Sequence, residues 1–79
     1  MRDALDQLCA RGPWAGRDDD RQSWTLTGAD LRVLYDQVAT GAPIPDRSAR
    51  RTDRALQLLR RAGLIRYVRW QWVAAEVAR

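Results

Sequence analysis

The chain has 79 residues, a formal net charge of +4, 46% hydrophobic and 30% charged residues, so it predicts one folded domain rather than a disordered chain. It has no histidine, no lysine and a single cysteine, Cys9. This composition argues against general acid–base, Schiff-base and zinc chemistry. We therefore predict a protein that is not an enzyme, with no catalytic residue, no cofactor and no metal site.

Location and assembly are also constrained by composition. No apolar run approaches the ~18 residues of a membrane span, and the polar N-terminus is unlike a secretory signal. The lone cysteine allows no internal disulfide, so we expect a cytoplasmic protein that does not contact a membrane. A chain this short buries only about 60–65% of its unfolded surface, which makes homodimerisation compatible with its size.

Residues 2–11 predict a short helix that ends at Gly12-Pro13. Leu5, Leu8 and Cys9 share one face of it, so Cys9 is interpreted as a small core residue, with a reactive or dimer-bridging thiol as the alternative. Residues 13–22 predict a loop, in which Trp14 covers the edge of the core. The triplet Asp18, Asp19 and Asp20 is interpreted as solvated; a metal site or a phosphate mimic is the alternative, although the turn glycine and alternating ligands of a calcium loop are missing.

Residues 23–27 alternate in polarity and predict a strand with Trp24 and Leu26 on one face. Thr27 is expected to cap the next helix together with Asp30. That helix, residues 28–40, has an apolar stripe and ends at Gly41, before a stiff connector with two prolines. The stripe consists of Leu31, Leu34, Tyr35 and Val38.

Residues 46–62 predict a second amphipathic helix, capped by Asp46 or Ser48 and ended by Gly63 in a Schellman motif. Its predicted buried stripe is Ser48, Thr52, Ala55, Leu58, Leu59 and Ala62. Beside this stripe, within an arc of roughly 80°, lie Arg47, Arg50, Arg54, Gln57 and Arg61. Six arginines and two aspartates give this segment a charge of +4, and the rest of the chain is neutral.

Residues 64–68 and 70–73 are rich in β-branched and aromatic residues and predict a hairpin with Arg69 near its turn. Trp70 and Trp72 are expected to point to one side of the second strand. They form either part of the core or an exposed patch for a partner.

The basic helix, the stretch ALQLLRRAGLI and the aromatic hairpin together resemble the winged helix-turn-helix family. The resemblance implies an α+β fold of three helices with a small antiparallel sheet, in which the first strand pairs with the hairpin, called the wing. One departure is the connector between the two helices, which is longer than the 3–4 residues usual in the motif.

The resemblance also implies that the basic helix enters the major groove of double-stranded DNA, as in a small transcriptional regulator of a phage or mobile element. Arg50, Arg51, Arg54 and Ser48 would then approach bases, Arg47 and Arg61 phosphates, and Arg69 a minor groove. Some anti-CRISPR proteins look similar. The alternative is therefore a phage-encoded inhibitor that binds a host nucleoprotein complex, such as a Cascade-type subunit, and blocks its target DNA. The residues proposed for either partner are Arg47, Ser48, Arg50, Arg51, Arg54, Gln57, Arg61 and Arg69.

Overall fold

Three helices and two antiparallel hairpins make up the α+β fold seen in the computed structural model, which describes residues 3–18, 20–44 and 49–75. Within these ranges no helix is long and apolar enough to cross a bilayer. In chain order the elements are α1 (Ala4–Cys9), β1 (Trp14–Arg17), β2 (Ser23–Leu26), α2 (Gly28–Thr40), α3 (Arg50–Arg61), β3 (Ile65–Val68) and β4 (Gln71–Ala74).

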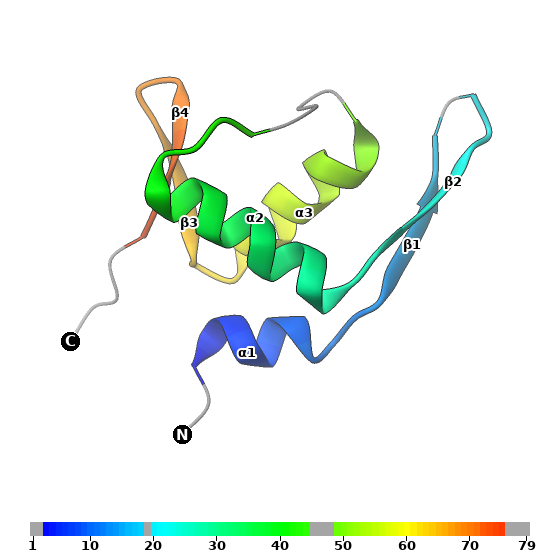
Figure 1. Cartoon of the computed structure of the whole chain (residues 1–79), viewed down its shortest axis with the longest axis horizontal. Helices are drawn as coiled ribbons and strands as arrows, with labels where there is room; N and C mark the ends of the chain where they lie inside the picture. Colours follow the sequence, from blue (N-terminus) through cyan, green and yellow to red (C-terminus); the bar gives the residue numbers. More distant parts are fainter. Residues whose placement is uncertain (1–2, 19, 45–48, 76–79) are drawn as a thin grey trace.

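The helices occupy the centre of the molecule, and the two hairpins lie on opposite sides of them (Figure 1). Strand β1 pairs with β2, and β3 pairs with β4, in two separate sheets. Hairpin β1–β2 extends away from the helices, while hairpin β3–β4 lies against the other end of α2 and α3 (Figure 1).

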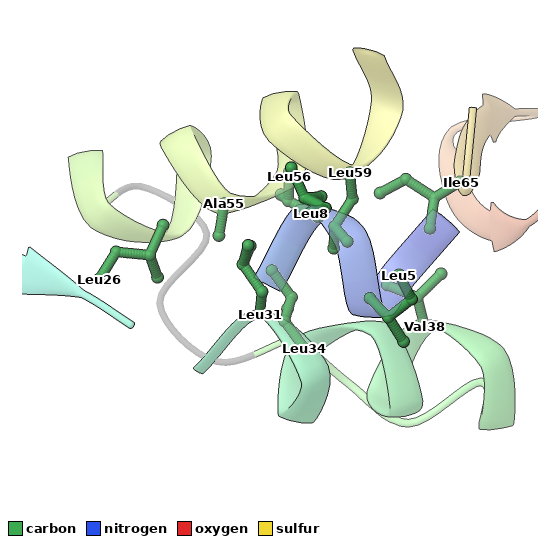
Figure 2. Packing of buried hydrophobic residues seen from close by; sticks show 10 residues of the cluster. All are labelled: Leu5, Leu8, Leu26, Leu31, Leu34, Val38, Ala55, Leu56, Leu59 and Ile65. Carbon is green, nitrogen blue, oxygen red and sulfur yellow. The ribbon is translucent and has the colours of Figure 1, made fainter. Parts of the chain in front are cut away.

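One apolar core joins all three helices. Figure 2 shows its side chains converging from α1, α2, α3, the end of β2 and the start of β3. The buried residues are Leu5, Leu8, Leu26, Leu31, Leu34, Val38, Ala55, Leu56, Leu59 and Ile65. Cys9 is half-buried at the rim, and this burial raises the pKa of its thiol above the ordinary value of 9.0. The thiol is therefore protonated at neutral pH, as a packing residue would be.

Helix α2 has the predicted bounds and the predicted cap. The Asp30 backbone N–H donates to Thr27 Oγ1 at 3.2 Å, and the Thr27 N–H donates to Asp30 Oδ2 at 2.8 Å. Gly41 ends the helix in the left-handed conformation, with φ of 76°, where glycine has no Cβ to clash. Its apolar stripe is also confirmed, with Leu31, Leu34 and Val38 buried.

Helix α3 begins later than predicted, at Arg50, and Ala49 occupies its N-cap without a side-chain hydrogen bond. The expected caps Asp46 and Ser48 lie outside the described residues. The predicted Schellman ending is confirmed: the Leu64 N–H donates to Leu59 O and the Gly63 N–H to Arg60 O, both at 3.0 Å. The buried face is rotated from the prediction, because packing against α2 and β3 buries Leu56 and leaves Ala62 exposed.

The loop predicted for residues 13–22 is wrong, because Trp14–Arg17 forms strand β1. Its register places Trp14 opposite Leu26 and Gly16 opposite Trp24. A Cβ at Gly16 would lie 2.2 Å from Cζ2 of Trp24, so the missing side chain makes room for the indole. The expectation that the first predicted strand pairs with the wing is also wrong, since residues 23–26 pair with β1 instead.

Hairpin β3–β4 has a two-residue turn made of Arg69 and Trp70, which confirms the predicted place of Arg69. Both residues have positive φ, 50° and 69°, as a type I′ turn requires. Trp70 belongs to the turn rather than to β4. The rings of Trp70 and Trp72 both contact Tyr67, with ring centroids 6.4 and 5.0 Å from it. Trp70 is 84% exposed, whereas Trp72 packs partly against the core.

Candidate nucleic-acid interface

Helix α3 turns a row of polar side chains toward a groove of about 450 Å³. The row consists of Arg50, Arg54, Gln57 and Arg61, here called the arginine row. Its spacing of four, three and four residues follows the 3.6-residue helical turn, so the four side chains lie on one face. Hairpin β1–β2 forms the opposite wall of the groove, through Trp14, Ala15, Gly16, Arg17 and Trp24.

The charge of this groove is strongly positive. Arg17, Arg50, Arg54 and Arg61 line it, and Asp53 is the single acidic residue among its described lining residues. All five side chains are exposed. Arginine presents a planar fork of donors that suits phosphate and guanine edges, so the groove is equipped to hold a polyanion.

Arg51 has a different environment from the arginine row. Its Nε donates to the Thr25 carbonyl oxygen at 2.9 Å, and its second guanidinium nitrogen lies 2.7 Å from Asp30 Oδ2. These contacts join α3 to the end of β2 and to the first turn of α2. We infer that Arg51 orients hairpin β1–β2 relative to α3.

A second hollow, of about 320 Å³, lies between α3 and hairpin β3–β4. It is lined by Asp53, Leu56, Gln57, Arg60, Tyr67 and Trp72. Asp53 and Gln57 line both hollows. The exposed face of α3 therefore lies between two hairpins, and Arg69 belongs to the turn of the second one. Of the other predicted site residues, Arg47 and Ser48 lie outside the described residues.

A third hollow, of about 530 Å³, separates the end of α2 from β4, and none of its described lining residues is charged. Within the acidic triplet, Asp19 lies outside the described residues. Asp18 and Asp20 shape the turn of hairpin β1–β2, where the Asp18 N–H donates to Gln22 O and the Gln22 N–H donates to Asp20 Oδ1. Among the described residues no cluster of acidic or cysteine side chains could hold a metal ion.

Arg17, Trp24 and Arg60 line these hollows but were not among the predicted site residues. Arg17 was missed because its segment was interpreted as a loop. The sequence signal that favours a hairpin is a pair of short alternating stretches, Trp14 with Gly16 and Trp24 with Leu26, joined by a short polar turn. Arg60 was assigned only to the last helical turn, and its position beside Tyr67 and Trp72 depends on how hairpin β3–β4 packs.

Comparison with known proteins adds no template for this arrangement. No family model, curated protein or solved structure matches the chain. The chemistry of the α3 face is therefore the basis for assigning a function.

Proposed function

We propose that this is a non-enzymatic DNA-binding protein of the winged-helix type, as expected of a small transcriptional regulator, and that it binds double-stranded DNA through the exposed face of α3. The observation that supports this proposal is the arginine row on one open face. Helix α3 contains five arginines and one aspartate, and one arginine, Arg51, is engaged by Asp30. Arg50, Arg54, Arg60 and Arg61 are exposed, so their positive charge lies at the surface.

The geometry of α3 fits a duplex. Arg50 and Arg61 are eleven residues apart, which corresponds to about 16 Å along the helix axis. The major groove of B-DNA is about 12 Å wide and admits one α-helix. A helix placed there would bring the ends of the row to the phosphates and its middle, Arg54 and Gln57, to the base edges. Arginine bonded to guanine and glutamine bonded to adenine are the corresponding base contacts.

The test is a salt titration of duplex binding by fluorescence anisotropy. Contact with two to four phosphates predicts a log–log slope of roughly −2 to −4, at about −0.9 per phosphate. We expect Arg61→Ala to flatten this slope by about one unit on any sequence. If Arg54 contacts a base, Arg54→Ala should lower the preference for a selected site by about 1–3 kcal/mol.

The matched control is Arg11→Ala, which removes one positive charge from an exposed position outside the groove. It should leave the slope unchanged. Absence of duplex binding by the wild-type protein at about 50 mM salt, where phosphate contacts are strongest, would overturn the proposal.

The exposed turn of hairpin β3–β4 favours a second candidate, the inhibitor of a host nucleoprotein complex. Trp70 is 84% exposed, and Tyr67 stacks edge-on to it with ring centroids 6.4 Å apart. Exposed tryptophan and tyrosine side chains are common anchors of protein interfaces. Under this second proposal, Trp70→Ala abolishes binding to the protein partner, and the wild type binds duplex DNA only weakly and without sequence preference.

A further inference from the structure

We propose that hairpin β1–β2 is a second phosphate-binding wing, in which Arg17 contacts the DNA backbone beside the strand contacted by α3. This inference rests on the proposed function and adds a contact surface to it. The wing predicted from sequence is hairpin β3–β4. The additional surface lies on the opposite side of the helices, as the positions of the two hairpins in Figure 1 make clear.

The position of Arg17 is the first support. Arg17 is the last residue of β1, is paired with Ser23 and is exposed. It lines the same groove as Arg50, Arg54 and Arg61. Among the lining residues that the structure describes, there are four guanidinium groups and one carboxylate, that of Asp53, so like charges repel one another there. A ligand with several regularly spaced negative charges would relieve this repulsion.

The aromatic residues of hairpin β1–β2 favour the DNA backbone over bases as the ligand of this hairpin. Trp14 and Trp24 pack against the core and are half-buried. The Trp24 indole packs closely on Gly16 of β1 and against the core, which holds it between strand and core. A ring in that position supports the groove floor but cannot rotate outward to stack on a base without losing its packing.

The hairpin is attached to the helix that it would assist. The bond from Arg51 Nε to Thr25 O connects α3 to β2, and Gly16 lets Trp24 close over β1. Arg17 is thereby held at a set position relative to the arginine row. Preorganised donors lose less conformational entropy when they bind, so such an arrangement favours phosphate contact.

The experiment compares Arg17→Ala, Arg17→Lys and Arg11→Ala with the wild type, on a random-sequence duplex between about 50 and 200 mM salt. Loss of one phosphate contact should flatten the slope by about 0.9. Over this fourfold range, the wild type would then lose about 3.5-fold more affinity than Arg17→Ala. Arg17→Lys should keep the wild-type slope, because lysine also binds phosphate. Circular dichroism verifies that each variant is folded.

Three results would overturn the inference, and they are distinguishable. If Arg17→Ala keeps the wild-type slope while Arg61→Ala flattens it, hairpin β1–β2 does not contact the backbone and the proposed function survives. If the wild type does not bind the duplex at all, the proposed function and this inference fail together. A slope flattened equally by Arg11→Ala and Arg17→Ala would also contradict the inference, since it would reflect net charge alone.

Discussion

Arg51 and Arg54 are separated by less than one turn of α3, yet their guanidinium groups have different surroundings. Arg51 bonds to Thr25 O and pairs with Asp30, whereas Arg54 lines the groove beside Asp53. Residue type alone cannot distinguish them, because every basic side chain in this protein is arginine. The difference depends on the acceptors that each side chain reaches.

The Asp30 carboxylate accepts hydrogen bonds from the Thr27 backbone N–H and hydroxyl, and it pairs with Arg51. The Thr27 backbone N–H is the main cause that holds the pKa of Asp30 below its ordinary value of 3.8, with the Thr27 hydroxyl and Arg51 contributing further. A carboxyl group whose pKa is lower in the folded state stabilises the fold above its unfolded pKa. That stabilisation is lost as the pH falls from about 3.8 through the folded pKa.

We therefore expect Asp30→Asn to unfold more easily than the wild type at pH 7, by about 1 kcal/mol, as for loss of a helix cap. The difference should shrink as the pH falls below about 3.8, because the wild-type carboxyl group then becomes neutral too. Urea unfolding measured across pH tests this expectation. Asp36→Asn, at an exposed position of the same helix, is the control; a gap for Asp30→Asn that stays constant down to pH 2 would contradict the charge argument.

At the scale of elements, α3 is the helix whose exposed face is bordered by both hairpins. Hairpin β1–β2 lies against its arginine row, and hairpin β3–β4 lies against Arg60 and Leu56. Asp53 lines both hollows, and it is in the first turn of α3, where the helix dipole favours a negative charge. If the face binds DNA, this carboxylate opposes binding while it contributes to helix stability.

We expect Asp53→Asn to bind duplex DNA several-fold more tightly than the wild type at low salt, because one repulsive charge is removed from the groove. The gain should decrease as salt screens the remaining interactions. The helix should lose no more than about 0.3–1 kcal/mol of dipole stabilisation. Anisotropy titrations at two salt concentrations measure both effects.

Asp36→Asn again supplies a control, since it makes the same change of net charge on α2, outside the groove. Equal gains from both variants would show that only net charge matters. Weaker binding by a folded Asp53→Asn would show that Asp53 accepts a hydrogen bond from the ligand, as aspartate does from cytosine.

At the scale of the whole molecule, the fold is flat and its core is small. The principal extents are 43 × 31 × 18 Å, and the core consists of side chains from α1, α2, α3, β2 and β3 (Figure 2). Leu31 is completely buried within it. A domain of this length has a total stability of roughly 4–12 kcal/mol, so one such side chain accounts for a large part of it.

We expect Leu31→Ala to lower the free energy of unfolding by about 2–5 kcal/mol, through lost burial and the cavity left behind. Both hairpins should lose structure in the same transition, because the core includes residues from each. Thermal unfolding followed by circular dichroism and by tryptophan fluorescence measures this coupling. Val33→Ala, on the 59% exposed side chain of the same helix, should change stability by less than about 0.5 kcal/mol. Separate transitions for the two probes would contradict a single cooperative core.

Local chemistry was sufficient to predict several elements from the sequence. Helix α2 was predicted with its bounds, because Thr27, Asp30 and Gly41 supply its end signals within a few residues of chain. The Schellman ending at Gly63 and the turn at Arg69 were predicted for the same reason. The helical spacing of the arginine row also depends only on the 3.6-residue turn.

Tertiary structure decided the rest, because it depends on residues that are distant in sequence or on competing packing partners. Strand β1 forms because Gly16 leaves room for the indole of Trp24 across the hairpin, and β2 therefore pairs with β1 rather than with hairpin β3–β4. The buried face of α3 is set by α2 and β3, which favour Leu56 over Ala62. The placement of Arg17 beside the arginine row follows from the same packing, since no periodicity along the chain relates β1 to α3.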